Sequence, residues 1–405
     1  MLRSGSICAS LLYKYLTTTD DTVDKSDKYQ KNLLKVKMLA DTFSSYGGIL
    51  SKISQMINYA YGIHDSDVYS DCKPINENKT KEFLESELLE FDDDIASYER
   101  KVFKSGSVGQ VHRAVHRDKR DIVIKVQYVG LKEIFDSDSF ILDSIVKYLF
   151  TDANIKDAMA DIRCQLYEEL DYTIEAKNQM FMKEIWDKEG VDIKIPDIVP
   201  ELCNTKILTM EYISDTESLN QFLDTSSKED IKVIGDLIIR FMFVNLFKYG
   251  LIYTDVHYGN FLVKDKKILY VLDFGSIHHI DKRINSYLGC LMNSIYIEDK
   301  DQFYYIMETL GVIPEKGIST ESREYMWEYF RLQFRPWITD ELFEFTNEFV
   351  DECALRNVAL MNEWVLPAKM IWLNKLCHGF SHIIGKMNFK GNYLDMFREL
   401  GVYTK

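Results

Sequence analysis

The sequence predicts an α+β chain in two lobes, with a small antiparallel sheet followed by a larger helical part. Between residues 98 and 127, apolar residues alternate with polar or charged ones, which is the period of half-buried strands. From residue 213 onward, apolar residues recur at helical spacing over most of the chain. The chain has 405 residues, of which 46% are hydrophobic, so each lobe can bury a core.

The part before the sheet is expected to be helical. We interpret residues 1–30 as a tail with a short helix and a polar connector, and residues 31–98 as a helical extension. Apolar residues recur at helical spacing over 29–60, and residues 80–95 have the pattern of an acidic amphipathic helix.

The sheet lobe is expected to span residues 99–212. A charged run, residues 116–120, fits a hairpin turn between two of its strands. In chain order, we expect strands at 99–104, 109–116 and 121–127, helical segments at 131–150 and 155–188, and a strand pair at 197–200 and 205–212.

The helical lobe is expected to span residues 213–405. Its first long helix runs over 231–249 and ends at Gly250, a plausible C-cap. A hairpin over 260–273 follows, and its second strand is a short apolar run that delivers Asp273 to its end.

Three side chains in this lobe stand in the order that phosphoryl transfer needs. Asp255 and Asn260 are five positions apart, as are the base and a metal-binding Asn in protein-kinase catalytic loops. Asp273 opens an Asp-Phe-Gly triplet and is the candidate main Mg²⁺ ligand, because Mg²⁺ prefers oxygen ligands. Each motif alone also fits a polar turn or a strand end. Together they predict a protein-kinase-like two-lobe fold with a helical N-terminal extension and Asp255 as the catalytic residue.

Lys125 and the loop before it are candidate nucleotide-binding residues. Lys125 lies in the third expected strand, from which an ammonium can pair with nucleotide phosphates, although an exposed strand lysine is the alternative. The loop over 105–110 joins the first two strands. Gly106, Ser107 and Gly109 in this loop let backbone N–H groups approach phosphates.

Glu175 is the candidate ion-pair partner of Lys125. By helical spacing Glu175 shares one face with Glu168 and Asp171, an arrangement that is ordinarily only a solvated face. The fifty residues between Lys125 and Glu175 exceed the separation in an ordinary protein kinase, so the small lobe is expected to carry a helical insertion.

The strand that ends at Tyr212 is expected to run into a hinge beside a nucleotide base. Met210 would lie behind adenine, and the backbone from Glu211 to Ile213 would offer hydrogen bonds to its edge. Leu262 would pack under the base. A plain core strand fits this segment equally well.

Charge and cysteine content limit the partners and the compartment. The net charge of −15 argues against nucleic acid as the main partner, because phosphate neutralisation needs a basic face. The seven cysteines are scattered without a C-x-x-C pair, so we interpret them as reduced thiols, most of them buried, in a reducing intracellular compartment.

Membrane association and targeting leave only weak signals. No run of about 18 apolar residues is present, so no membrane span is predicted. The first nineteen residues lack acids and carry Arg3 and Lys14, which is compatible with an organellar, mitochondrial-type presequence. An ordinary N-terminal helix is the interpretation that we favour.

Seven segments resemble, in the same order, the motifs of the UbiB family, also called the ABC1 or ADCK atypical kinases. The resemblance runs from about residue 35 to the C-terminal helices. The segments are Lys52–Gln55, Ser107–His112, Val123–Gly130, Glu169–Asn178, Leu208–Tyr212, Asp255–Asn260 and Leu272–Gly275.

The resemblance implies a protein-kinase-like fold that binds ATP and Mg²⁺. It assigns Lys52 and Gln55 to the family's K-x-G-Q motif, in an N-terminal extension that packs over the active site and obstructs protein substrates. It assigns Glu169 and Asp171 to an acidic E-x-D motif. ATPase activity, or phosphorylation of a small lipid-like molecule in isoprenoid-lipid or ubiquinone metabolism at a membrane surface, is therefore implied.

The chain departs from the family pattern at several positions. The motif glycine is Ser54, and Gly106 falls in a loop that is typically alanine-rich, so we expect this loop to favour phosphoryl transfer over nucleotide holding alone. The two prolines that flank the catalytic-loop histidine are Val256 and Tyr258. Tyr253 replaces a histidine, and the adenine-pocket alanine is replaced as well: Val123.

Three functions remain open from the sequence. The first is an ATP-dependent phosphotransferase or ATPase. The second is a small-molecule kinase of the aminoglycoside or choline type, which shares the Asp-x-His-x-Gly-Asn loop but is disfavoured by residues 105–112 and 169–178. The third is a nucleotide-gated scaffold without catalysis. The amphipathic segments 29–60 and 283–310 could touch a bilayer, although core packing is favoured for both.

Overall fold

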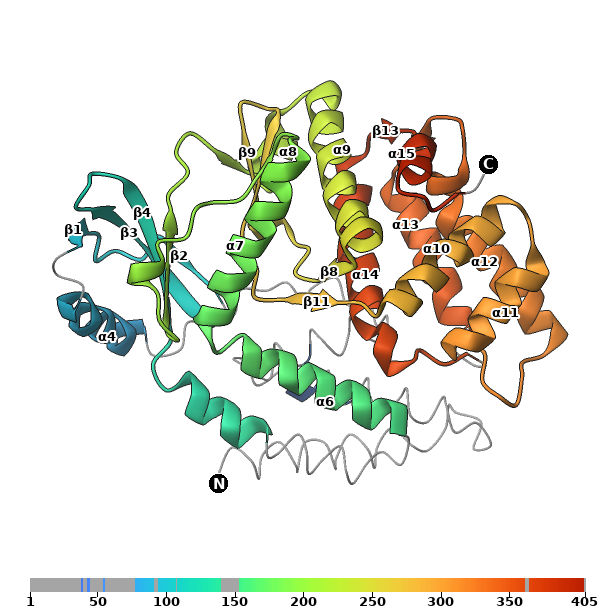
Figure 1. The fold of residues 1–405 in the computed structure, drawn as a ribbon, viewed down its shortest axis with the longest axis horizontal. Helices are drawn as coiled ribbons and strands as arrows, with labels where there is room; N and C mark the ends of the chain where they lie inside the picture. The colour runs from blue at the N-terminus through green and yellow to red at the C-terminus, as the bar shows by residue number, and fades with distance from the viewer. Residues whose placement is uncertain are drawn as a thin grey trace. The chain divides into compact units, whose positions relative to one another are not determined.

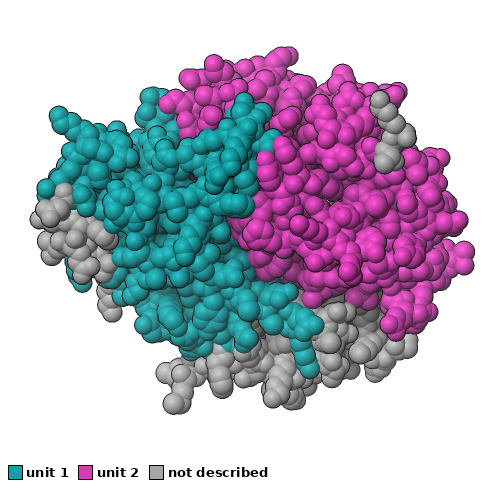
Figure 2. Space-filling model, in the orientation of Figure 1, with its two compact units in different colours: residues 1–191, 195–215, 273–276 teal, residues 192–194, 216–272, 277–405 magenta. Residues whose placement is uncertain are grey.

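The structure is a computed structural model, and it describes most of the chain beyond residue 76. The described residues are 38, 42, 43, 54, 77–90, 94–106, 108–139, 153–360 and 364–403. The chain divides into two compact units, coloured separately in Figure 2. Unit 1 comprises Met1–Val191, Ile195–Asp215 and Asp273–Ser276, and unit 2 comprises Asp192–Lys194, Thr216–Leu272 and Ile277–Lys405.

Unit 1 contains an antiparallel sheet in the order β1-β3-β4-β6, with β2 also paired to β3 (Figure 1). The predicted bounds of β3 and β4 are confirmed residue for residue. The strands are β1 Ile95–Tyr98, β2 Lys104–Ser105, β3 Gly109–His116, β4 Asp121–Gln127 and β6 Ile207–Glu211.

The first strand differs from its prediction. We expected a single strand over 99–104, but the chain follows β3 in two pieces, β1 and β2. Between β1 and β2, two backbone hydrogen bonds join this segment to β3. The Glu99 N–H donates to Arg113 O (2.7 Å), and the Phe103 N–H donates to Val111 O (2.8 Å). The exposed pair Arg100 and Lys101 lies between these bonds. Because successive side chains of a strand point to opposite faces, two adjacent residues cannot both lie on the solvent face of a regular strand.

Helices cover both faces of this sheet. Helix α4 (Glu77–Glu90) places Leu84 in a core with Ile122 and Ile124, so the helix predicted over 80–95 ends before β1 begins. Helix α7 (Tyr172–Glu189) packs on the other face, where Tyr172 contacts the cluster around Leu208. Figure 1 shows α4 and α7 on either side of the strands. Residues 131–139 are also helical.

The helical stretch predicted over 155–188 is two helices, α6 (Ala153–Glu168) and α7. The break falls at Asp171, whose backbone is extended and whose carboxylate accepts the Thr173 N–H at 2.9 Å as the N-cap of α7. The prediction that Glu168, Asp171 and Glu175 share one helix face is therefore wrong.

The strand predicted at 197–200 reduces to one isolated bridge, between Ile198 and Met210. The reason is Pro200, which begins a 3₁₀ turn, η1 (Pro200–Leu202), and cannot donate to a ladder.

In unit 2, the long helix and its end are confirmed. Helix α9 (Lys228–Val244) continues as a π-helical turn, η2 (Asn245–Tyr249), and stops at Gly250, which takes a left-handed φ of 66°. The predicted hairpin is also present and belongs to a sheet of order β5-β10-β9-β7. Its strands are β5 Ile193–Lys194, β7 Glu217–Ser218, β9 Phe261–Lys264 and β10 Ile268–Val271.

The remaining elements of unit 2 are short strands, 3₁₀ turns and helices. Strand β8 pairs with β11, and β12 pairs with β13. The strands and 3₁₀ turns are β8 Leu251–Tyr253, η3 Tyr258–Asn260, β11 Ile277–His279, β12 Phe343–Glu344, η4 Ala368–Met370 and β13 Lys390–Gly391. The helices are α8 Leu219–Thr225, α10 Lys282–Tyr296, α11 Lys300–Leu310, α12 Thr320–Ile338, α13 Asn347–Leu360, α14 Ile371–Met387 and α15 Leu394–Glu399.

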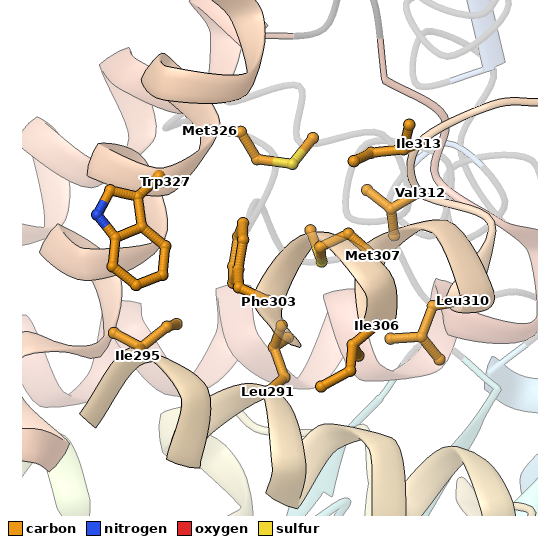
Figure 3. Close-up of a cluster of buried hydrophobic side chains, with 10 residues drawn as sticks. All are labelled: Leu291, Ile295, Phe303, Ile306, Met307, Leu310, Val312, Ile313, Met326 and Trp327. Carbon is orange, nitrogen blue, oxygen red and sulfur yellow. The ribbon is translucent and has the colours of Figure 1, made fainter. Parts of the chain in front are cut away.

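The apolar residues of 283–310 fill a core. Phe303 of α11 lies amid side chains from α10 and α12, among them Leu291 and Trp327 (Figure 3). This segment therefore packs inside the protein, as favoured above. The other amphipathic segment, 29–60, is outside the described residues apart from four helical positions. Among the helices that the structure describes, none is long and apolar enough to cross a membrane.

The described cysteines are free thiols, but they are less buried than predicted. Cys164 and Cys290 are exposed, and Cys203, Cys353 and Cys377 are partly buried. The prediction that most are buried is wrong, because an isolated cysteine has no periodic neighbours that would fix its side of a helix.

Candidate active site

Unit 1 brings together a lysine and two carboxylates that are far apart in the sequence. The ammonium of Lys125, on β4, donates to both carboxylate oxygens of Glu175, on α7, at 2.8 and 2.9 Å. It also donates to Asp273 Oδ2 at 3.1 Å. Alternation along β4 turns Lys125 away from the core that holds Ile124. The predicted partnership of Lys125 and Glu175 is thus present in the geometry.

One cation faces two carboxylates in this cluster. Burial alone would lower the pKa of Lys125, but the carboxylates of Asp273 and Glu175 hold that pKa well above its usual value of 10.5. Burial raises the pKa of Glu175 to about 7, and the charge of Asp273 adds to this rise while Lys125 opposes it. One ammonium thus faces two carboxylates, and a further cation bound beside them would favour the ionised form of Glu175.

Asp273 has a strained backbone that two helices hold in place. Its φ is 60°, the left-handed region that non-glycine residues seldom adopt. Asp273 Oδ1 accepts the Gly275 N–H at 3.1 Å. Gln165 of α6 donates to Gly275 O at 2.8 Å, and Asn178 of α7 donates to Phe274 O at 3.0 Å.

Sequence reasoning gave neither of these two supporting residues a role. Asn178 was visible as the last residue of a family motif, so its importance could have been suspected. Gln165 has no sequence signal, because its partner lies 110 residues away.

The glycines of the loop before β3 serve different purposes. The Gly106 N–H donates to Gly109 O at 2.8 Å and closes a tight turn. A Cβ on Gly109 would lie 2.4 Å from Val126 O and 2.6 Å from the Tyr172 hydroxyl, so only glycine fits there. A Cβ on Gly106 would have Gly109 O as its nearest neighbour, at 3.6 Å. Ser107 lies outside the described residues.

The expected hinge is a strand end whose N–H groups are partly used within the protein. Met210 lies opposite Val123 in the sheet. The Glu211 N–H donates to Asp197 O at 2.8 Å, and the Tyr212 N–H donates to Asp121 O at 3.0 Å. A nucleotide base at this strand would have to bond other backbone atoms of the segment.

An arginine that sequence reasoning missed lies at the same strand end. The Arg113 guanidinium lies 4.2 Å from the centre of the Tyr212 ring, and the edge of Phe103 approaches that ring with centroids 6.0 Å apart. No local pattern marked Arg113, because an arginine in a strand ordinarily faces solvent.

Unit 2 holds the catalytic loop, in which Asn260 binds Asp255. The Asn260 amide nitrogen donates to Asp255 Oδ2 at 2.7 Å and to Asp255 O at 2.9 Å. Both amide protons are thereby used, and the amide oxygen is left for a cation. The Leu272 N–H donates to Asn260 O at 2.8 Å, which bonds this loop to the residue just before Asp273. Leu262, in β9, pairs with Tyr270.

His257 and Tyr253 have defined roles in the same loop. His257 Nδ1 accepts the Gly259 N–H at 3.0 Å, so its own proton is on Nε2, 4.0 Å from Asp255 Oδ2. The buried Tyr253, which stands where the family has a histidine, donates its hydroxyl to Leu272 O at 3.0 Å.

Each unit offers oxygen donors of the kind that Mg²⁺ prefers. In unit 1 these are the carboxylate oxygens of Asp273, and in unit 2 the amide oxygen of Asn260. Of the acidic motif, Asp171 caps α7, and Glu169 lies near Gly275, where an added Cβ would be 3.9 Å from Glu169 Cγ. Lys52 and Gln55 lie outside the described residues.

A five-stranded sheet with its lysine–glutamate pair, joined to a helical part with an Asp-x₄-Asn loop, defines a protein-kinase-like protein. Residues 67–307 match the ABC1 atypical kinase-like domain, and the chain belongs to this family. The family resemblance and the kinase-like fold class predicted from the sequence are both confirmed.

Related proteins come from several kingdoms. Atypical kinase COQ8, mitochondrial, from Saccharomyces cerevisiae is 23% identical, and the match covers 96% of this chain and 78% of the relative. The protein ACTIVITY OF BC1 COMPLEX KINASE 8, chloroplastic, from Arabidopsis thaliana is 29% identical over 73% of this chain and 39% of its own. An uncharacterized Clostridium pasteurianum protein encoded 5′ of hydrogenase 1 is 26% identical over 78% of this chain and 62% of its own. The chain thus spans less than two thirds of the length of these last two relatives.

A solved structure supports the fold. Rv3197 from Mycobacterium tuberculosis, determined in complex with erythromycin, superposes with a TM-score of 0.66 at 21% identity. The match covers 81% of this chain and 83% of that one. At this identity the likeness establishes the fold alone.

Proposed function

We propose that this chain is a Mg-ATP-dependent phosphotransferase or ATPase. The observation that carries the proposal is the Lys125–Glu175–Asp273 cluster, together with the bond from Asn260 to Asp255. The ammonium is held between the buried carboxylate of Glu175 and the partly exposed carboxylate of Asp273. With both carboxylates ionised there is one more than charge balance requires, which suits a site that receives a metal–triphosphate complex.

Each residue of the proposed site has a separate role. Lys125, fixed by Glu175, binds phosphate oxygens, and Asp273 and Asn260 hold Mg²⁺. Bound Mg²⁺ neutralises charge on the phosphates. Asp255 orients or deprotonates the acceptor, and its half-exposed carboxylate is restrained by Asn260. Gly106 and Gly109, with Ser107, form the phosphate loop, while Met210, Glu211, Tyr212 and Leu262 line the base.

The acceptor is proposed from family resemblance rather than from a described contact. We propose a small lipid-like molecule of isoprenoid or ubiquinone metabolism, phosphorylated at a membrane surface in a reducing compartment. Two relatives whose names place them in mitochondria or chloroplasts are consistent with an organelle.

We also propose that Lys52 and Gln55 act from an N-terminal extension over residues 31–98 and limit access to the site. The two lobes are then residues 99–212 and 213–405.

Nucleotide turnover tests the central proposal. Purified protein is assayed for ADP and for phosphorylated product with and without Mg²⁺ and lipid vesicles, alongside Asp255→Asn. A general base contributes about 10²–10⁴-fold, so the variant should lose at least about 100-fold in kcat while still binding ATP. Asp224→Asn, an exposed carboxylate on α8, is the matched control. Wild-type turnover by Asp255→Asn would reject its assigned role. If the wild type binds ATP but forms no product, the result would favour the nucleotide-gated scaffold without catalysis.

A further inference from the structure

Helix α14 lies directly against the proposed catalytic loop. A Cβ added to Gly379 of α14 would lie 2.8 Å from Val256 O and 3.1 Å from Val256 Cβ. Val256 immediately follows Asp255 and is buried. The loop backbone therefore rests on the bare backbone of the helix, with no side chain between them.

A second contact lies further along the same helix. The Tyr258 hydroxyl donates to His382 O at 3.1 Å, and the Tyr258 and His382 rings meet edge to face with centroids 5.7 Å apart. The Lys386 ammonium lies 4.6 Å from the centre of the Tyr258 ring. Gly379, His382 and Lys386 follow the three- and four-residue spacing of one helix face, so a single face of α14 meets the loop.

The two loop residues in these contacts stand where the family has prolines. Proline restricts φ and would stiffen the backbone on both sides of His257 by itself. Val256 and Tyr258 lack that restriction, so this loop needs another constraint, and the contacts with α14 supply one. The carboxylate of Asp255 is bonded within the loop to Asn260. Because Val256 directly follows Asp255 in the chain, a shift of Val256 would displace this reacting group.

We propose that α14 is the positioning element for Asp255, with Gly379 and Tyr258 as its positioning residues. This inference rests on the proposed function, because it concerns the geometry of the same catalytic group. It assigns to α14 a role in turnover. Nucleotide binding should be affected less, since Lys125 and Glu175 are held by β4 and α7.

Two glycine variants on one helix separate positioning from packing. Gly379→Ala and Gly385→Ala each place a Cβ inside 3.0 Å of a neighbour in α14, but the neighbour of Gly385 is Val350 Cγ2 of α13, at 2.8 Å. We expect Gly379→Ala to lower kcat for ATP turnover at least about tenfold with KM changed less than about threefold, because small misplacements of a reacting group are costly. Gly385→Ala should keep kcat near wild type and should lower the thermal midpoint less, because a valine methyl group can give way more easily than a backbone carbonyl. Equal effects of the two variants on kcat would overturn the proposal.

If Gly379→Ala fails to fold, substitutions at Tyr258 test the same proposal. Tyr258 is the first residue of a 3₁₀ turn, and His257 before it is extended (φ −144°, ψ 159°), so proline fits at position 258. Tyr258→Ala should lower kcat, and Tyr258→Pro, which stiffens the loop without α14, should recover most of it. A Tyr258→Pro variant no faster than Tyr258→Ala would reject the inference. Absence of turnover in the wild type would instead reject the proposed function, and this inference with it.

Discussion

At the residue scale, two glycines three positions apart in the proposed phosphate loop differ in the space available for a side chain. Gly109 has no room for a Cβ beside Val126 O, whereas a Cβ on Gly106 would make an ordinary van der Waals contact with Gly109 O at 3.6 Å. Gly106 is also the position at which the chain departs from the alanine-rich pattern of its family. The steric difference makes Gly106 a site where backbone freedom can be changed without damage to packing.

We expect Gly106→Ala to fold normally and to lower ATP turnover roughly tenfold, because a stiffer turn adapts less well to the transferring phosphate. Steady-state kinetics and a melting curve measure both properties. Gly109→Ala is the contrasting variant and should lower the melting temperature. Unchanged turnover in Gly106→Ala would show that this glycine does not favour phosphoryl transfer.

Tyr172 presents a second residue-scale question. Its ring is buried beside Lys125, whose ammonium lies 5.0 Å from the ring centre, and its hydroxyl has no hydrogen-bond partner among the described residues. An unsatisfied buried hydroxyl costs about 1–3 kcal/mol. We therefore expect Tyr172→Phe to raise the free energy of unfolding by about 1 kcal/mol. Denaturant titration measures this, and a destabilised variant would mean that the hydroxyl is satisfied in solution.

At the element scale, α7 links helix stability to the candidate site. It carries Glu175 in its first turn and Asn178 in its second, and its N-cap is Asp171. Fraying of the first turn would loosen the partner of Lys125. Asp171, a residue of the acidic motif, thus stabilises α7 as its N-cap, a role that its spacing in the sequence did not predict.

Asp171→Ala should lower the free energy of unfolding by about 1 kcal/mol, the usual cost of losing an N-cap, and should also weaken ATP binding. Asp281→Ala is the matched control, because Asp281 caps α10 through the Arg283 and Ile284 N–H groups, in a helix that carries no proposed site residue. Calorimetric titration with ATP and Mg²⁺ distinguishes the two. Equal ATP affinity in both variants would show that the N-cap of α7 does not influence ATP binding.

The elements also show which parts of the fold were predictable. Strands β3 and β4 and the end of α9 at Gly250 were found because alternation and C-capping are local signals. The spacing of Asp255 and Asn260 predicted a base and a metal ligand in one loop, and the structure shows these two side chains hydrogen-bonded to each other. The break at Asp171 was missed because its flanking residues are all compatible with a continuous helix. Arg113, Gln165 and Gly379 were missed because each acts through a partner distant in the sequence or across a sheet.

At the scale of the whole molecule, one partly buried histidine should influence how stability depends on pH. His278 is stacked on Trp372 with centroids 4.1 Å apart. Burial, the positive charge of Lys375 and the neighbouring His279 together lower the pKa of His278 to about 3, with burial as the largest cause. The unfolded chain takes up a proton here near pH 6.5, whereas the folded chain does so only near pH 3.

Between these two values the unfolded state binds more protons, so stability should fall as the pH falls. The slope from this group is at most about 1.4 kcal/mol per pH unit. His278→Phe keeps a ring against Trp372 and removes the titration, so its unfolding midpoint should fall less than that of the wild type between pH 6.5 and 5. Measurements at pH 7.5, where the imidazole is neutral in both states, are the reference. Parallel pH profiles would exclude His278 as the source.

The uneven exposure of the cysteines has a practical consequence for spectroscopy. Burial raises the pKa of Cys353 to about 12 and that of Cys377 to about 11, which suppresses their reaction with maleimides near neutral pH. Cys164 and Cys290 are exposed, and they belong to unit 1 and unit 2 respectively. With Cys8 and Cys72 replaced by serine, this native pair offers attachment points for a donor and an acceptor fluorophore. Energy transfer between them would report whether nucleotide changes the separation of the two units, without any cysteine being introduced.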